Sequence, residues 1–262
     1  MDLELAGKTI IVTGGASNIG RAITLTSVAE GASVIIAELD EAQAQKVVKE
    51  TGGKATAMKV DIGDWEQVQA MVKKVLDKFK AVDVLINNAA WERDSLFVDK
   101  PREDIIKEIN VNYLGMINCT QAVLPHMIER KSGNVVSVGS DAGRMGEYRE
   151  GVYAGTKGAI IALTKTLARE NGRYGLRFNV VCPGLTPGEP GEIGNMSLWN
   201  VPVLSAVYSA PEARAKAAKA YPLRKLGTAQ DIANAVVFMA SDLRAGHITG
   251  QTLSVSGGYS MV

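Results

Sequence analysis

Tyr153 and Lys157 are the two residues of this sequence whose types and spacing best suit proton transfer. They stand four positions apart in the segment Tyr-Ala-Gly-Thr-Lys, and on a helix this spacing puts both side chains on one face. A free tyrosine has a pKa of about 10 and is a poor base at neutral pH. A lysine ammonium beside the phenol favours the phenolate, so the pair predicts a general acid/base acting on a hydroxyl group.

A glycine-rich segment near the N-terminus has the pattern of a phosphate-binding turn. Residues 13–21, Thr-Gly-Gly-Ala-Ser-Asn-Ile-Gly-Arg, directly follow a β-branched apolar run and lead into a segment with helical spacing. A strand, a glycine-rich turn and a helix N-terminus together present backbone N–H groups and a positive dipole end to a pyrophosphate. This order therefore predicts a dinucleotide site.

An acidic residue stands where such a site needs one. Glu38 closes the second β-branched run, roughly 20 residues beyond the glycine-rich turn, where dinucleotide folds bind the ribose hydroxyls of the adenosine. A carboxylate there repels a 2′-phosphate, and no arginine or lysine follows it directly. The cofactor that we expect is therefore NAD and not NADP.

Two kinds of segment alternate along the chain and would position these residues. Short, nearly continuous apolar runs are typical of strands that are covered on both faces of a parallel sheet. Such runs occupy residues 9–12, 33–36, 82–86, 134–138 and 177–181. Longer stretches with helical spacing, such as residues 68–79, lie between them. The alternation predicts an α/β fold of the Rossmann type, a doubly wound parallel sheet with helices on both faces.

One irregular stretch interrupts what we expect to be a single domain over residues 1–262. Between Pro183 and Pro202 the chain is rich in glycine and proline, and a loop this long within a compact domain is usually functional. An alanine-rich helix around residues 211–220 follows it. We interpret residues 185–220, approximately, as a substrate lid; the alternative is a disordered connection.

The composition limits the kinds of partner. The 262 residues carry a formal net charge of +1, so no general field attracts nucleic acid or an anionic membrane. Cys119 and Cys182 lie in separate apolar segments, and no Cys/His cluster indicates a metal site. No apolar run approaches the roughly 20 residues that span a bilayer, and the N-terminus lacks signal-peptide character. We expect a cytoplasmic protein with a small-molecule substrate and without a metal, nucleic-acid or membrane partner.

Taken together, these motifs resemble the short-chain dehydrogenase/reductase family over nearly the whole chain. The glycine-rich turn is similar to the family's TGxxxGxG signature, with Asn18 in place of a glycine; asparagine tolerates the left-handed backbone conformation well. The segment Asn-Asn-Ala-Ala at residues 87–90 resembles the family's NNAG stretch, with Ala90 replacing glycine. Tyr153 and Lys157 form its YxxxK motif, and residues 249–259 match its C-terminal segment.

The resemblance implies hydride transfer between an alcohol and a nicotinamide, with roles for particular residues. Ser140 corresponds to the catalytic serine, whose hydroxyl stabilises charge on the substrate oxygen. Asn112 corresponds to the fourth catalytic member and would hold a water that links Lys157 to solvent. The implied cofactor contacts are Gly14, Ser17, Asn18, Ile19, Gly20, Glu38, Leu39, Asp61, Ile62, Asn88, Ala89, Tyr153, Lys157, Pro183, Gly184 and Thr186.

Residues outside the motifs decide the substrate. Their mixed aromatic and basic character suits a bulky apolar group attached to an anionic one. Besides Ser140, the expected substrate contacts are Trp91, Arg93, Arg144, Tyr148, Arg149, Met196 and Trp199. The ending at residues 253–261 resembles the family branch of aromatic and alicyclic acid degradation, such as 2-hydroxycyclohexanecarboxyl-CoA and 2-[hydroxy(phenyl)methyl]succinyl-CoA dehydrogenases. The expected reaction is NAD-dependent oxidation of a hydroxyacyl-CoA thioester to the oxoacyl-CoA.

Two other functions stay open at this point. One is a 3-oxoacyl carrier-protein reductase, which usually prefers NADP, or a polyol or cyclic alcohol dehydrogenase. The other, of a different class, is a non-catalytic subunit of a hetero-oligomeric dehydrogenase, which the departures Asn18, Ala90 and Gly188 suggest and the intact catalytic set disfavours. The resemblance also implies pairing through two long helices, at residues 105–128 and 153–171, into homo- or hetero-oligomeric dimers or tetramers.

Overall fold

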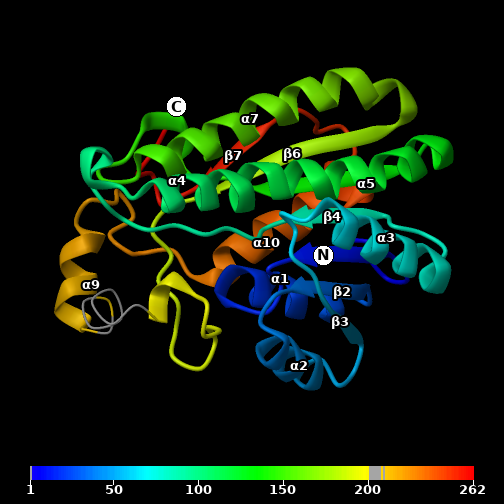
Figure 1. The fold of residues 1–262 in the computed structure, drawn as a ribbon, viewed down its shortest axis with the longest axis horizontal. Helices are drawn as coiled ribbons and strands as arrows, with labels where there is room; N and C mark the ends of the chain where they lie inside the picture. Colours follow the sequence, from blue (N-terminus) through cyan, green and yellow to red (C-terminus); the bar gives the residue numbers. More distant parts are fainter. Residues whose placement is uncertain (1, 201–207, 209) are drawn as a thin grey trace.

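The computed structural model of the chain describes residues 2–200, 208 and 210–262. Seven parallel strands form one sheet in the order β3-β2-β1-β4-β5-β6-β7, and helices cover both of its faces (Figure 1). The strands are β1 (Thr9–Thr13), β2 (Ser33–Glu38), β3 (Ala55–Lys59), β4 (Val84–Asn87), β5 (Gly133–Val138), β6 (Leu176–Pro183) and β7 (Thr252–Val255). The expected doubly wound Rossmann-type α/β fold is confirmed.

The helices lie on the two faces of the sheet in two groups. The first group consists of α1 (Asn18–Ala29), α2 (Glu41–Glu50) and α10 (Ala229–Ala240). The second consists of α3 (Trp65–Phe79), α5 (Gly115–Arg130) and α7 (Gly151–Asn171). Shorter helices are α4 (Arg102–Glu108), α6 (Ala142–Met145), α9 (Pro211–Ala218) and α11 (Asp242–Ala245). Among the described residues, no helix is long and apolar enough to cross a membrane.

Successive residues of the central strands pack into two different cores. In β1, Ile10 and Val12 contribute to the core shared with α1 and α10, whereas Ile11 contributes to the core shared with α3 and α5. All three side chains are fully buried. Because both faces of the strand are covered, its sequence is continuously apolar and does not alternate. The helical stripe predicted in α3 is confirmed as core, since Val68, Met71, Val72 and Val75 are buried.

The two edge strands were not predicted from apolar runs. β3 begins at Ala55 and ends at Lys59, and the residues between them are only half-buried. β7 at residues 252–255 is half-buried or exposed throughout. An edge strand packs less of its surface into the core, so its sequence needs no continuous apolar run. Both strands belong to the sheet through parallel pairing with β2 and β6.

The long helix expected at residues 105–128 is divided into three parts. α4 ends at Glu108, a π-helical segment, η2, covers Ile109–Leu114, and α5 begins at Gly115. Isolated π-helical turns are rare and occur frequently at functional sites. This one carries Asn112. The second helix expected, at residues 153–171, is confirmed as part of α7; their pairing with another subunit stays a prediction.

The order of the strands places the site. The chain moves from β1 outward to β3 and then returns to the other side of β1 at β4. In open α/β sheets, ligands bind beyond the carboxyl ends of the strands at such a reversal. Gly14, Glu38, Asn88 and Ser140 all lie at or just beyond the carboxyl ends of β1, β2, β4 and β5. Residues that are distant in sequence therefore meet beyond the carboxyl ends of the strands.

Candidate active site

The glycine-rich turn after β1 has the conformation that the sequence predicts. Gly14 has a φ of +60° and Asn18 a φ of +44°, so the asparagine does occupy the left-handed region. A Cβ atom at Gly20 would lie 2.0 Å from the carbonyl oxygen of Gly14, which leaves room for glycine only. The Asn88 side chain donates hydrogen bonds to the carbonyls of Thr13 and Gly14, both at 3.0 Å. These contacts fix the turn at the N-terminus of α1, where a phosphate is favoured.

Asn18 also connects this turn to the irregular stretch after β6. Its Nδ2 donates a hydrogen bond to the carbonyl oxygen of Thr186 at 3.1 Å, and its backbone N–H donates one to the carbonyl oxygen of Glu192 at 2.9 Å. Arg21 forms an ion pair with Glu192 at 3.1 Å. The described part of the expected lid therefore lies against α1. The lid residues 201–207 and 209 lie outside the described residues, and the alanine-rich helix is observed as α9.

A cavity of about 250 Å³ extends from the glycine-rich turn to Tyr153. The predicted cofactor contacts on its wall are Gly14, Ser17, Asn18, Ile19, Glu38, Leu39, Asp61, Ile62, Asn88, Ala89 and Tyr153. Gly20, Lys157, Pro183, Gly184 and Thr186 are not among its lining residues. Gly20 packs against the carbonyl group of Gly14. Thr186 is buried, and its carbonyl oxygen accepts a hydrogen bond from Asn18. These two residues therefore support the turn without lining the cavity.

The adenosine end expected from the sequence is acidic. Glu38 lies at the end of β2, and its Oε1 accepts a hydrogen bond from the Leu39 backbone N–H at 2.9 Å. Burial raises the pKa of Glu38 above its usual value, although backbone hydrogen bonds to the carboxylate oppose this. Asp61 lines the same end and accepts a hydrogen bond from the Gly63 N–H at 2.9 Å. Lys107 is the one basic residue among the described lining residues, and its Nζ lies 4.1 Å from the ring centroid of Trp91.

The catalytic residues predicted from the sequence meet at the other end of the cavity. Tyr153 and Lys157 both lie on α7, and the Lys157 Nζ is 5.5 Å from the centroid of the phenol ring. Ser140 follows β5 and hydrogen-bonds the Tyr153 side chain. Lys157 is 2% exposed and donates a hydrogen bond to the carbonyl oxygen of Val138 at 2.8 Å. Serine, tyrosine and lysine are thus adjacent although they come from two elements.

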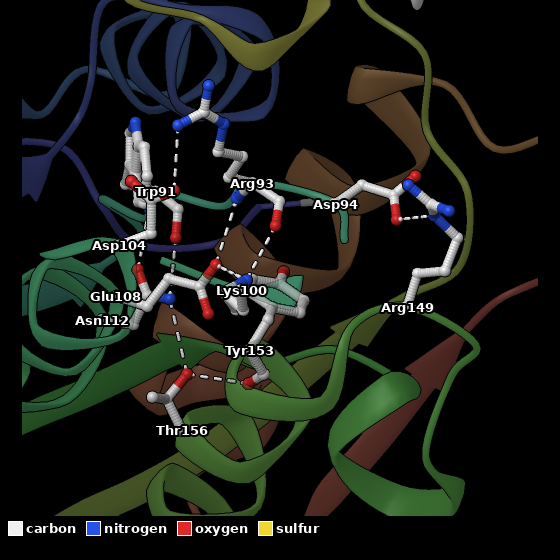
Figure 2. Close-up of polar contacts among 10 residues, drawn as sticks. All are labelled: Trp91, Arg93, Asp94, Lys100, Asp104, Glu108, Asn112, Arg149, Tyr153 and Thr156. Atoms are coloured by element: carbon white, nitrogen blue, oxygen red, sulfur yellow. Dashed lines mark hydrogen bonds and ion pairs between the residues drawn. The ribbon is translucent and has the colours of Figure 1, made fainter. Parts of the chain in front are cut away.

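Asn112 is held in the same region by the chain that follows β4. Its Oδ1 accepts a hydrogen bond from the Trp91 backbone N–H at 2.7 Å, and its Nδ2 donates to the Trp91 carbonyl at 2.9 Å (Figure 2). Asn112 and Lys157 also line a second, small cavity of about 10 Å³ together with Val138. A volume of that order approaches the least space that one water needs, roughly 10–15 Å³. The arrangement suits a water between lysine and asparagine.

The protein groups around Tyr153 favour its protonated form. Burial raises the pKa of Tyr153 well above its usual value, and the nearby acids Glu92 and Glu150 raise it further, while the hydrogen bond with Ser140 lowers it. Burial also lowers the pKa of Lys157 to about 8. In a dry site the cost of desolvating each charge exceeds the benefit of one neighbouring cation. The phenol of this structure is therefore protonated at neutral pH, ready to donate to an oxygen.

The expected substrate residues fall into two sets. Trp91, Met196 and Trp199 line the cavity. The three arginines do not; each forms an ion pair with a carboxylate, at 2.9 Å for Arg93–Asp104, 2.6 Å for Arg149–Asp94 and 3.6 Å for Arg144–Asp141. Tyr148 is 74% exposed and also lies outside the lining. Among the described residues, the basic group on the wall beside Trp91 is therefore Lys107, which the sequence did not indicate, and not one of the three arginines.

Glu92 is the principal lining residue that was not predicted. It stands between Trp91 and Arg93 and lines the cavity together with Tyr153. Burial and the neighbouring acids raise its pKa to about 8. A glutamate in a loop is ordinary in sequence, and nothing in its spacing indicates a site. Only the proximity of the loop to α7 distinguishes it from the exposed acids of the chain.

Comparisons with known proteins agree with this arrangement. The family model described as short chain dehydrogenase matches residues 8–190. The chain is 35% identical over 260 residues to 3-oxoacyl-[acyl-carrier-protein] reductase FabG of Thermotoga maritima, covering 98% of this chain and 99% of that protein. It is 33% identical over 261 residues to 3-oxoacyl-[acyl-carrier-protein] reductase of Synechocystis sp., covering 98% of each.

A solved structure, "ElxO with NADP Bound", superposes with a TM-score of 0.86 at 30% identity and covers 96% of this chain and 98% of that one. A tyrosine-to-phenylalanine variant of ElxO with NADPH bound gives the same TM-score at 29% identity, with the same coverage. The sequence match spans far more than half of the chain, and the parallel sheet is the one that the resemblance implied. The chain therefore belongs to the short-chain dehydrogenase/reductase family and is an oxidoreductase that uses a nicotinamide cofactor.

Proposed function

We propose that this protein interconverts a hydroxyacyl thioester and the corresponding oxoacyl thioester, with NAD as its cofactor. The observation that carries the proposal is that Tyr153, with Ser140 and Lys157 beside it, lines one end of a cavity whose other end holds Glu38. One end suits proton transfer to a carbonyl oxygen, and the other suits adenosine ribose hydroxyls. The acyl group would be carried by coenzyme A, as in the branch of the family that the C-terminal segment resembles.

Each catalytic residue has a step that its position supports. Tyr153, protonated in the buried site, donates its proton to the ketone oxygen in reduction and removes it from the alcohol in oxidation. Ser140 hydrogen-bonds the same oxygen and stabilises the charge that develops there. Lys157 would return a proton to Tyr153 through the water position beside Asn112. A bound nicotinamide supplies the hydride donor or acceptor, and its oxidised form adds positive charge that favours the phenolate.

The residues present fit a nicotinamide dinucleotide. The glycine-rich turn leaves no side chain at Gly20, and Asn88 fixes the carbonyls on its inner side. The N-terminus of α1 that follows would bind the pyrophosphate, and the Asn18 N–H, which donates to Glu192, would have to exchange that bond to take part. Glu38 would accept hydrogen bonds from the ribose hydroxyls and would repel a 2′-phosphate. No arginine among the described residues lines that end of the cavity. These features favour NAD, although the ElxO structures contain NADP and NADPH.

A second candidate has support of its own. The curated relatives described above are 3-oxoacyl carrier-protein reductases, at 33–35% identity over almost the full chain. Their substrate is also an oxoacyl thioester, so both candidates share the reacting group. They differ in the carrier, in the direction of hydride transfer and in the nucleotide. Glu38 is the residue that separates them, since it disfavours the 2′-phosphate of NADPH.

The test is a substrate and nucleotide panel followed by the absorbance of reduced nicotinamide. The panel contains hydroxyacyl-CoA thioesters, 3-oxoacyl carrier-protein thioesters, the free hydroxy acids and simple polyols, each with NAD(H) and NADP(H). We expect turnover with the CoA thioesters and NAD. Turnover with the carrier-protein thioesters and NADPH would favour the second candidate, and turnover with polyols alone would refute the thioester proposal.

Calorimetry tests the alternative of a non-catalytic subunit. We expect NAD to bind to the isolated chain, with enthalpy released on titration. If neither nucleotide binds and no substrate turns over, the chain would have to be a subunit that retains the fold for assembly alone.

A further inference from the structure

Glu92 lies on the wall of the cavity that Tyr153 also lines, at the start of the loop that follows β4. Among the described residues, no backbone or side-chain group hydrogen-bonds its carboxyl, whereas each arginine of this region has a carboxylate partner. The side chain is half-buried, so its carboxyl is accessible to a molecule that enters the cavity.

The backbone on both sides of Glu92 is held by buried polar contacts. Trp91 exchanges two hydrogen bonds with the Asn112 side chain, at 2.7 and 2.9 Å. Arg93 donates its N–H to Glu108 at 3.1 Å, and its carbonyl accepts from Lys100 at 2.7 Å (Figure 2). Lys100 and Glu108 form an ion pair that is almost completely buried. These contacts fix the backbone on both sides of Glu92 and so hold its Cα at the wall of the cavity.

We propose that the Glu92 carboxyl hydrogen-bonds a second oxygen of the substrate, beside the alcohol or ketone carbon, and so selects substrates that carry one. The proposal rests on the proposed function, in which that second oxygen is the thioester carbonyl. Glu92 then determines specificity, while Ser140 and Tyr153 act on the reacting oxygen. A carboxyl group kept neutral in an apolar site is a strong hydrogen-bond donor to a carbonyl.

The charges around Glu92 agree with a protonated carboxyl. Burial first, and then the acids Glu150, Glu108 and Asp94, raise its pKa to about 8, while Lys100 opposes them. Tyr153 and Lys157 also face it, since its charge affects the pKa of both. At neutral pH Glu92 therefore carries its proton and donates. Above about pH 8 it ionises, loses the donor and repels the carbonyl oxygen.

The experiment compares two substrates in the full-length protein with its nucleotide. One is a 3-oxoacyl N-acetylcysteamine thioester, and the other is a simple ketone of matched length without the second carbonyl. We expect Glu92→Leu to lower the ratio of kcat/KM for thioester over ketone roughly tenfold, since one buried hydrogen bond is lost. Glu92→Gln keeps a hydrogen-bond donor in its side-chain amide. Its ratio should therefore stay within about threefold of that of the wild type, a smaller change than the loss of one hydrogen bond would cause.

Glu150→Gln is the matched control. It removes an acid that raises the pKa of both Glu92 and Tyr153 but does not line the cavity. The substrate ratio at pH 6, where Glu92 keeps its proton, should therefore not change, and only the pH at which the ratio falls should shift downward. Raising the pH from 7 to 9 should lower the ratio in the wild type but leave it constant in Glu92→Gln, because an amide does not ionise. Equal losses for both substrates in Glu92→Leu, or an equal change in Glu150→Gln, would refute the proposal.

Urea unfolding provides a readout that is independent of turnover. We expect Glu92→Leu to be at least as stable as the wild type, because an unpartnered polar group is replaced by an apolar one. A clear loss of stability would show that Glu92 is structural and would overturn the inference. A wild type that reduces the ketone but not the thioester would instead refute the proposed function, so the two failures are distinguishable.

Discussion

The two ends of the cavity are built in different ways. The nucleotide end consists of contiguous segments, the turn at residues 13–21 and the end of β2, and most of its polar atoms bond to neighbours within a few residues or to the adjacent strand. The substrate end is assembled from α4, η2, α7 and the loop at residues 91–100, joined by contacts across the chain. Local contacts predominate at the first end, where the stretch after β6 adds contacts to Asn18 and Arg21, and tertiary contacts fix the second end. A substitution at the nucleotide end should therefore affect mainly its own contacts, whereas a substitution at the substrate end should also affect the stability of the elements that it joins.

The largest effect is expected where the two ends meet, at Tyr153. Tyr153→Phe removes the proton that passes to or from the substrate oxygen, so kcat should fall by about 10²–10⁴-fold or more. The nucleotide end does not depend on this hydroxyl, and calorimetry should show NAD binding close to that of the wild type. A variant that keeps its turnover would show that another group transfers the proton.

The next largest effect tests the substrate end. Lys100→Met leaves the carboxylate of Glu108 buried without its cation, and we expect the free energy of unfolding to fall by about 3–5 kcal/mol. The double variant Lys100→Met/Glu108→Met removes both charges and should recover most of the loss. Urea denaturation measures both. If the single variant were as stable as the double, the pair would not be what fixes the loop.

The nucleotide end should respond to a change of one charge. In Glu38→Ser/Leu39→Arg the repulsive carboxylate is replaced and a guanidinium is added for the 2′-phosphate. We expect the ratio of kcat/KM for NADP over NAD to rise by about ten- to a hundredfold, equivalent to about 1.4–2.7 kcal/mol. Stability should change little, because Leu39 is exposed at 39%. An unchanged ratio would mean that Glu38 does not face the ribose.

The smallest effect is expected at Asn18, where the turn meets the lid. Asn18→Ala keeps a side chain in the left-handed region without local hydrogen bonding, so stability should fall by about 1–2 kcal/mol. Asn18→Gly adopts this conformation freely and loses only the contact with Thr186. Its free energy of unfolding should therefore lie closer to that of the wild type. A glycine variant as unstable as the alanine variant would make the contact with Thr186 the dominant contribution.

The five central strands of the sheet, the glycine-rich turn and the proposed Ser/Tyr/Lys set can be recognised in the sequence alone. The strands were visible because burial on both faces requires continuous apolar runs. The turn and the Tyr153–Lys157 pair were visible because backbone conformation and helical spacing act over a few residues. These features are local, so their signals lie in short segments of the sequence.

The tertiary structure alone decided the substrate end. The arginines Arg93, Arg144 and Arg149 have the residue type of an anion site, but each is paired with an acid that folding brings beside it. The pKa of Tyr153 is set chiefly by burial, which spacing along a helix does not reveal. Glu92 faces the cavity only because Asn112, Glu108 and Lys100 hold the chain on either side of it. Charge pairing and desolvation depend on neighbours in space, and for that reason the sequence did not reveal them.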